Sequence, residues 1–290
     1  MKLDGRREST NVEDRRGKSG GAAKAGGLGL GGIIIIGLIW LLTGQAPDSE
    51  TIQQITQGQT TTEYTSDGQD YSNVDVELMQ FAKQILAGTE DVWTAEFKKM
   101  GKTYIPPKMV IFSGAVSSAC GSATSDSGPF YCSGDQTVYL DLDFFKSMKD
   151  EIGADGDFAY AYVIAHEVGH HVQYLLGDLQ AAHNKMNSLS EKESNKISVR
   201  LELQADFYAG VWAYNDNKKF GSLEAGDVDE GLAVASKIGD DYLQRQAYGY
   251  TVPDSFNHGT SAQRSRWLKK GLNCGDWRQG DTFSVSYDSL

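Results

Sequence analysis

The longest uninterrupted run of apolar residues lies near the N-terminus. Residues 25–47 carry no ionisable side chain, and residues 33–42 read IIIIGLIWLL. A membrane-spanning helix needs about 20 mostly apolar residues, so the pattern predicts a transmembrane anchor at residues 25–44. Two alternatives stay open. One is a cleaved signal peptide, since Gly44-Gln45-Ala46 resembles a cleavage site, although the preceding polar region is long for one. The other is a buried helix of the core.

The polar segments on the two sides of this run differ in charge and composition. Residues 1–24 carry seven Lys/Arg against four Asp/Glu, a net charge of +3. Because positive residues favour the inner side of a membrane, we expect the N-terminus inside and the rest of the chain outside. Residues 1–24 are polar and predict a disordered cytoplasmic tail. Residues 45–73 are rich in Gln, Thr and Ser, which is typical of a linker.

Residues 74–290 alternate between helical and strand-like periodicity and predict one folded domain. Gly88 and Gly177 are expected to end helices, and Asp157 to cap the start of one. The fold class that we expect is α+β, mostly helical with a small sheet, preceded by one transmembrane helix. The predicted helices cover residues 76–86, 91–100, 158–176, 191–215, 227–246 and 261–270, and the predicted strands cover residues 109–112 and 137–142.

Composition limits the kinds of molecule that the protein could bind. The chain has 290 residues, of which 40% are hydrophobic, and a formal net charge of −12 at pH 7. A hydrophobic fraction of this size permits a packed core. Nucleic-acid binding needs a basic face for phosphate contacts, so the acidic balance predicts that nucleic acid is not a partner. Composition does not determine the oligomeric state.

The three cysteines all follow the apolar run. Cys120 and Cys132 bracket a Gly/Ser-rich loop, and their separation of twelve residues is short enough for a disulfide in an oxidising compartment. Cys274 is the odd one, so we expect it to be a free thiol.

The strongest chemical signal is His166-Glu167-Val168-Gly169-His170. Residues four apart lie on one face of a helix, so His166 and His170 can share a cation. Glu167 follows the first histidine and can reach a water held there, which is the physical content of the H-E-x-x-H pattern. Five residues can match by chance, and a solvated His-Glu-His helix face is the alternative.

A catalytic zinc site usually has three protein ligands, so a third ligand is needed on another helix. Glu202 and Asp206 lie four apart within LELQADFYAG, an apolar stretch in which unpaired acids would be costly. We expect Glu202 to be the third metal ligand and Asp206 to accept a hydrogen bond from a liganding imidazole. The alternative is an exposed Glu202 and a buried, salt-bridged Asp206.

Together these segments resemble a family of bacterial, membrane-anchored, zincin-like neutral zinc metallopeptidases. The resemblance covers most of the chain, and it differs at Phe207, where relatives often carry a cysteine; a partner for Cys274 is therefore missing. The matching segments are NVEDRRG at residues 11–17, CGS at 120–122, GPFYC at 128–132, VYLD at 138–141, HEVGHHVQ at 166–173, ELQADFYAG at 202–210, GDD at 239–241, HGT at 258–260, Gln263-Arg264 and Trp267.

The resemblance implies a Zn²⁺ cofactor and a peptide or protein substrate. Combined with the predicted anchor, it implies a single-pass protein of the bacterial inner (cytoplasmic) membrane whose C-terminal domain is outside or periplasmic.

His258 is the remaining candidate for chemistry. It lies in a loop before the last predicted helix, within a family-like segment, and could donate to the oxyanion that forms when water attacks a carbonyl. The alternative is a histidine that only structures the loop. Asp240 and Asp241 are expected to pair with Arg245 or Arg264 and to carry no chemistry.

The hypothesis is endopeptidase-like hydrolysis in which His166, His170 and Glu202 hold zinc and Glu167 is the general base. The strand at Val138–Leu142 could be a sheet edge that aligns an extended substrate. A second hypothesis is a zinc-containing, membrane-anchored binding or scaffold module for which proteolysis is not essential. A metal-independent anchor domain is a third.

Overall fold

The structure is a computed structural model that describes residues 1–16 and 73–290. These residues form two compact units, each assembled from separate stretches of the chain. The helical unit contains residues 1–9, 84–106 and 154–290. The sheet unit contains residues 107–153 and the described residues between 10 and 83.

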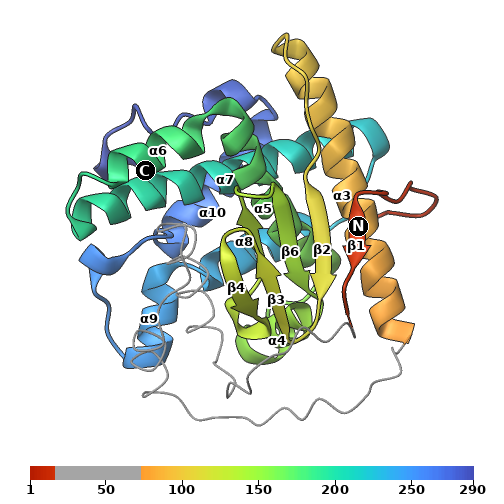
Figure 1. Ribbon diagram of the computed structural model, residues 1–290, viewed down its shortest axis with the longest axis horizontal. Helices are drawn as coiled ribbons and strands as arrows, with labels where there is room; N and C mark the ends of the chain where they lie inside the picture. The colour runs from red at the N-terminus through yellow and green to blue at the C-terminus, as the bar shows by residue number, and fades with distance from the viewer. Residues whose placement is uncertain (17–72) are drawn as a thin grey trace. The chain divides into compact units, whose positions relative to one another are not determined.

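The sheet unit is built on a four-stranded sheet in the order β1-β2-β6-β5 (Figure 1). β1, β2 and β6 are parallel, while β5 runs antiparallel to β6. A two-stranded antiparallel hairpin, β3-β4, precedes β5 along the chain. The elements are β1 (Val12–Asp14), β2 (Lys108–Phe112), β3 (Ala115–Ser118), β4 (Gly121–Thr124), η1 (Ser125–Ser127), β5 (Phe130–Cys132), β6 (Thr137–Asp141) and α4 (Asp143–Ile152).

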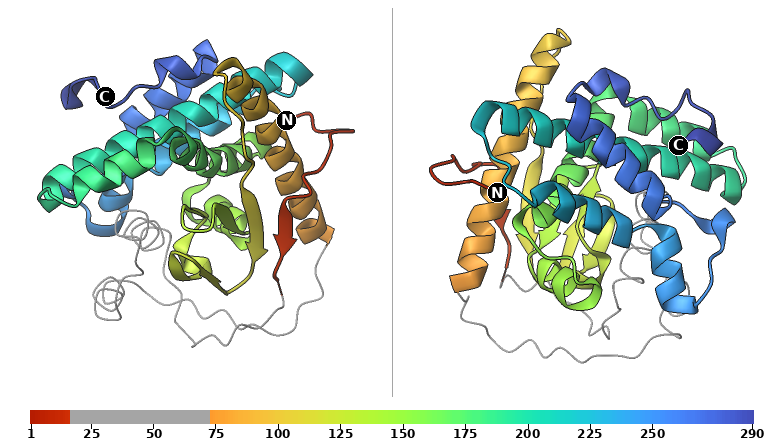
Figure 2. Two further views of the ribbon diagram at one scale, coloured as in Figure 1. Left: turned by 45° about the horizontal axis from the view of Figure 1, so that its top comes forward. Right: turned by 180° about the vertical axis from the view of Figure 1, so that it is seen from behind.

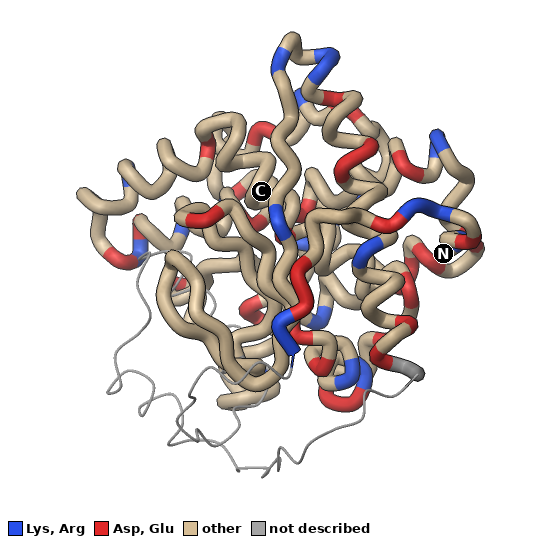
Figure 3. The backbone as a smooth tube through the Cα atoms, turned by 45° about the vertical axis from the view of Figure 1, so that its right-hand side comes forward, with Lys and Arg blue, Asp and Glu red and all other residues tan. Residues whose placement is uncertain are grey.

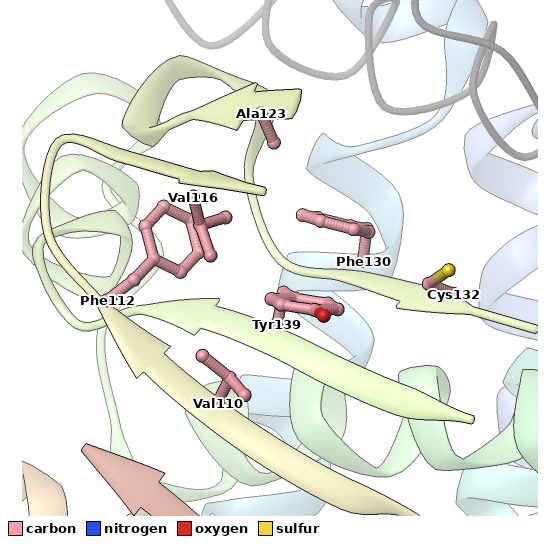
Figure 4. Close-up of a cluster of buried hydrophobic side chains, with 7 residues drawn as sticks. All are labelled: Val110, Phe112, Val116, Ala123, Phe130, Cys132 and Tyr139. Carbon is pink, nitrogen blue, oxygen red and sulfur yellow. The ribbon is translucent and has the colours of Figure 1, made fainter. Parts of the chain in front are cut away.

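An apolar cluster joins the hairpin to the sheet (Figure 4). Within it, the rings of Phe130 and Tyr139 stack with centroids 4.8 Å apart, which joins neighbouring positions of β5 and β6. Cys132, which is fully buried, is bonded to Cys120 with the two Cα atoms 5.8 Å apart. The predicted disulfide is therefore confirmed, and Cys274 is a free thiol as expected.

The helical unit is organised around α5, α7 and α10, with α7 packed against both of the others (Figure 2). Gly169 of α5 sits against α7 so closely that a Cβ there would lie 2.9 Å from the carbonyl oxygen of Ala205. This close approach holds the two metal-candidate helices together. The helices are α5 (Asp157–Leu176), α6 (Asp178–Met186), α7 (Glu191–Phe220), α8 (Asp227–Lys237), α9 (Asp240–Tyr248) and α10 (Ser261–Cys274), with short 3-10 turns at Pro253–Ser255, Trp277–Gln279 and Tyr287–Ser289.

Two helix predictions were wrong in their boundaries. Gly88 does not end a helix, because α3 (Asn73–Lys99) runs through it from the sheet unit into the helical unit. A Cβ at Gly88 would lie 3.0 Å from a carboxylate oxygen of Asp216, so this glycine permits close packing. The single helix predicted at residues 227–246 is two helices, α8 and α9. Gly239 separates them where the backbone meets Ser261.

Residues 1–16, which we expected to be part of a disordered tail, are folded onto both units. β1 hydrogen-bonds to β2 in parallel register, with Val12 opposite Met109. In the helical unit, Arg6 donates to both carboxylate oxygens of Asp216, at 3.2 and 2.7 Å. Blue and red residues follow one another closely along this segment in Figure 3, in keeping with its ion pairs.

The prediction of a transmembrane anchor is not supported, and the single-pass inner-membrane localisation is wrong. Within the described residues, no helix combines the length and the apolar character that a membrane crossing requires. The predicted anchor at residues 25–44 and the linker at 45–72 lie outside those residues.

The α+β part of the fold prediction agrees with the structure, but the expected sheet edge does not. β6 is hydrogen-bonded to β2 on one side and to β5 on the other. Its residues Thr137 to Tyr139 therefore have no free edge on which a peptide could add as a strand. The edges of this sheet are β1 and β5.

Candidate metal centre

Three side chains that the sequence pointed to meet inside the helical unit. Nε2 of His166 lies 3.2 Å from Nε2 of His170 and 3.2 Å from Oε2 of Glu202. Oε1 of Glu202 lies 3.3 Å from Nε2 of His170. All three residues are buried, and together they form a group that could hold a metal ion.

The helix geometry explains this convergence. His166 and His170 are one turn apart on α5, so their rings project from the same face. Glu202 is on α7, which the Gly169–Ala205 contact brings close to α5. The separation of four residues thus places the two histidine donors side by side on α5. The packing of α7 against α5 adds the carboxylate of Glu202 as the third donor.

The outer ring nitrogens of both histidines are engaged elsewhere. Nδ1 of His166 lies 2.8 Å from Oδ1 of Asp206, and a carboxylate of low pKa only accepts, so this Nδ1 carries the proton. Nδ1 of His170 lies 2.9 Å from Oε1 of Gln173. The Gln173 amide is oriented by its Nε2, which donates to the carbonyl of Leu201 at 2.6 Å. When both imidazoles are neutral, their Nε2 atoms present lone pairs to Glu202.

This donor set fits a zinc ion. Lone pairs of two imidazoles and a carboxylate that converge at 3.2–3.3 Å repel one another unless a cation lies between them. Two donors at about 2.0–2.1 Å from a tetrahedral Zn²⁺ are themselves roughly 3.3 Å apart, which is the spacing observed. Imidazole nitrogen and carboxylate oxygen are common zinc ligands.

The electrostatics of the site also favour a cation. Burial alone would lower the pKa of His166, but the charges of Asp206 and Glu202, and the hydrogen bonds to them, raise it to about 10. Burial would raise the pKa of Glu202, yet His170 and His166 hold it well below its usual range. The carboxylates of Asp206 and Glu202 therefore favour positive charge at the imidazoles, which a proton or a bound metal ion can supply.

Asp206 is held by more than the histidine. Arg264 of α10 donates to it through Nε at 2.9 Å and Nη2 at 2.8 Å. The hydroxyl of Tyr162 donates to Oδ1 at 2.6 Å. Arg264 opposes the effect of burial on Asp206 and lowers the pKa of that carboxyl. The buried ion pair keeps Asp206 charged as an acceptor for His166.

Glu167 has a different environment from the other acids. It is buried, and no hydrogen bond or ion pair engages its carboxylate in the part of the chain that the structure describes. Burial raises its pKa, with His166 and His170 acting in the opposite direction. A carboxylate with a raised pKa and no fixed partner is suited to proton transfer.

His258 does not join the group of three donors. Its Nδ1 lies 2.9 Å from Oδ1 of Asp240, and Oδ2 of Asp240 accepts the backbone N–H groups of residues 257–259 at 2.8–2.9 Å. A Cβ on Gly259 would lie 3.2 Å from Val199 and 3.4 Å from Leu203, on either side of Glu202 along α7. The loop that carries His258 therefore packs against α7, the helix that carries Glu202.

Sequence reasoning missed four residues that support this site. Arg264, Tyr162 and Gln173 bind its acids and histidines, and Asp240 organises the His258 loop rather than pairing with an arginine. Of these four residues, only Gln173 could have been predicted from the sequence, because it lies three residues after His170 on the same helix. The others depend on contacts between distant elements.

Comparisons with known proteins identify the family of the chain. The model of a family described as "Putative neutral zinc metallopeptidase" matches residues 1–283. The chain is 47% identical over 291 residues to "Uncharacterized protein YpfJ" of Escherichia coli K12, covering 99% of this chain and all of that protein. It is 40% identical over 217 residues to "Uncharacterized protein Rv2575" of Mycobacterium tuberculosis H37Rv, covering 71% of this chain and 72% of that protein.

No solved structure matches the chain. The family model spans nearly the whole length, and the E. coli relative aligns from end to end. The family description implies zinc and peptide substrates. The chain belongs to the neutral zinc metallopeptidase family.

Proposed function

We propose that this protein hydrolyses peptide bonds with a zinc ion held by His166, His170 and Glu202. The observation that carries the proposal is the convergence of three donor atoms at 3.2–3.3 Å, with both Nδ1 atoms hydrogen-bonded elsewhere. Membership of a zinc metallopeptidase family supports it independently. The substrate class is peptide or protein.

A Zn²⁺ ion bound there would lower the pKa of a water towards about 7 and polarise the scissile carbonyl. The chain's own part is proton transfer and orientation. Glu167, adjacent to His166 and with its pKa raised by burial, accepts the proton of the attacking water and passes it to the leaving amine. Asp206 and Gln173 hold the two imidazoles in one tautomer.

His258 is proposed to donate to the carbonyl oxygen as negative charge develops on it. The contact between its Nδ1 and Asp240 fixes the ring, and its loop packs against Val199 and Leu203 of α7, the helix that carries Glu202. Loss of such a donor lowers kcat by roughly 10²- to 10³-fold. His258→Ala should therefore lower kcat with little change in KM. An unchanged kcat would remove His258 from the mechanism.

The test of the function uses the purified full chain, because residues 1–16 pack against both units. Wild-type protein should carry about one zinc per molecule and cleave members of an unbiased peptide library. Glu167→Gln should keep the zinc and lose roughly 10²- to 10⁴-fold in kcat. Glu151→Gln, at an exposed position of α4, is the matched control and should cleave normally.

Two outcomes would contradict the proposal. Wild-type protein that binds no zinc would exclude the metal centre. Full activity in Glu167→Gln would exclude Glu167 as the base. If zinc binds but no peptide is cleaved, and Glu167→Gln fully rescues a deletion strain, the protein is a zinc-containing binding module instead.

A further inference from the structure

The helical unit contains a cavity of about 790 Å³ that is separate from the metal centre. Gln204 and Tyr208 of α7 and Asp178 of α6 are among its lining residues, together with Leu176, Trp277 and Phe283. None of the three metal-candidate residues lines it. Its volume lies in the range of small-molecule and side-chain binding pockets.

Hydrogen bonds show on which side of His170 the cavity lies. His170 directs Nε2 towards Glu202 and Nδ1 towards Gln173. Gln173 donates in turn to Oε1 of Gln204 at 3.0 Å, and Gln204 lines the cavity. The cavity therefore lies behind His170, away from the donor atoms that face Glu202. It is a second site and not an extension of the metal centre.

The most buried polar group available to a ligand is the hydroxyl of Tyr208. The residue is 3% exposed, and within the described residues its hydroxyl has no hydrogen-bond partner. Because Tyr208 lines the cavity, solvent reaches this hydroxyl, and it is free to donate to or accept from a ligand. Gln204 offers less, because its Nε2 already donates to the carbonyl of Gly280 at 3.1 Å.

Two carboxylates, Asp178 and Asp281, line the cavity together with three basic residues, and a cationic group would bind at the carboxylates. Burial raises the pKa of Asp178, and the negative charge of Asp281 raises it further, although Gln204 and Lys102 act against this. A cation between Asp178 and Asp281 would relieve their repulsion. The basic lining residues Lys102, Lys185 and Arg278 are exposed, and Arg278 is already paired with Asp276.

The apolar lining suits a long side chain with a charged end. Leu176, Trp277 and Phe283 are partly exposed and face the cavity. The methylene stems of Lys and Arg pack on apolar and aromatic surfaces while their charged ends reach polar groups. Tyr208 and Asp178 can both accept hydrogen bonds from such an end.

We propose that this cavity is a second binding site that takes the Lys or Arg side chain of a peptide segment. The charged end binds Asp178, Asp281 and the Tyr208 hydroxyl, and the stem packs on Trp277 and Leu176. Binding there needs neither zinc nor Glu167, so the proposal stands apart from the proposed hydrolysis.

The test is calorimetric titration of the full-length protein with end-blocked tripeptides. Ala-Lys-Ala should bind at least about tenfold more tightly than its norleucine analogue, which keeps the stem without the charge. The difference should persist after zinc is removed with a chelator and in His166→Ala. Equal binding of the two peptides, or tighter binding of Ala-Glu-Ala, would overturn the proposal.

Substitutions of the lining residues test whether the peptide binds in this cavity. Asp178→Asn and Tyr208→Phe keep side-chain size, and each should weaken Ala-Lys-Ala binding, the first by about tenfold. Lys102→Gln should strengthen it, because Lys102 competes for Asp178. Asp150→Asn, at an exposed position of α4 in the sheet unit, is the control and should bind normally. Normal binding by Asp178→Asn would overturn the assignment, as would loss of binding on chelation.

Discussion

The two histidines of the metal centre are oriented by partners of different charge. His166 donates to Asp206, a buried carboxylate that Arg264 keeps ionised. His170 donates to the neutral amide of Gln173. A carboxylate partner increases the basicity of an imidazole more than an amide does. We therefore expect His166 to be the stronger donor, and His170 to depend on Gln173 mainly for its orientation.

Replacing Gln173 tests this dependence. Gln173→Met keeps the length of the side chain but cannot accept from Nδ1 of His170. Zinc affinity, measured by competition with a chelating indicator, should fall by roughly 10- to 100-fold. Gln180→Met, whose wild-type side chain is exposed on α6 and bonds Asn184, is the control and should not change it. Unchanged affinity in Gln173→Met would show that packing alone orients His170.

For single residues, the sequence was sufficient to predict which side chains meet wherever helical spacing sets their positions. His166 and His170 are four apart, as are Glu202 and Asp206, and the structure brings the expected atoms together. Arg264 could not be assigned to Asp206, because they are joined only by the packing of α10 on α7. The His258 loop could not be placed for the same reason.

At the scale of elements, periodicity located α5 and β6 well but not the breaks between helices. Both Gly88 and Gly239 lie within apolar, helix-like stretches of sequence, yet Gly88 lies inside α3 and Gly239 is the N-cap of α9. The two glycines differ in what they pack against: Gly88 packs against Asp216, and Gly239 packs against the backbone of Ser261. β1, only three residues long, forms because β2 offers it an edge.

Asp141, the last residue of β6, predicts a pH dependence of stability. Asp141 is 1% exposed, and burial raises its pKa to about 6 from 3.8, although Ser125 and the amide of Asp143 act against this. The folded state therefore favours the protonated acid. This contribution is full below about pH 4 and is lost as pH rises through about 6, with a change of about 3 kcal/mol.

Chemical denaturation between pH 4 and 7 measures this change. Asp141→Asn should lack this part of the pH dependence, while Asp150→Asn, at an exposed position, should retain it. The prediction fails if wild type and Asp141→Asn lose stability in parallel over this range.

For the whole molecule, the main correction concerns residues 1–16. Their positive charge suggested a tail held inside a membrane, whereas in the structure Arg6 and Arg7 form ion pairs with residues far along the chain. These two pairs could not be predicted from the sequence, because the partners lie more than 80 positions away, as between Arg7 and Glu90. A fragment that begins at residue 74 lacks β1 and leaves Asp216 without Arg6.

Arg6→Met measures how much the N-terminal segment contributes. Asp216 is 1% exposed, and removing one partner of a buried pair costs about 3–5 kcal/mol. The free energy of unfolding should fall by that amount. In Arg15→Met, which breaks an exposed pair with Glu13, the loss should be under about 1 kcal/mol. Equal losses would show that the Arg6–Asp216 pair does not hold the segment.

The central claim is that His166, His170 and Glu202 bind zinc. Zinc X-ray absorption spectroscopy on the full-length protein tests it most directly. The spectrum should show two imidazole nitrogens and a carboxylate oxygen at about 2.0–2.2 Å from the zinc, and the His166→Ala/His170→Ala variant should lose the bound zinc. A sulfur ligand at about 2.3 Å, or zinc that remains bound in that variant, would contradict it.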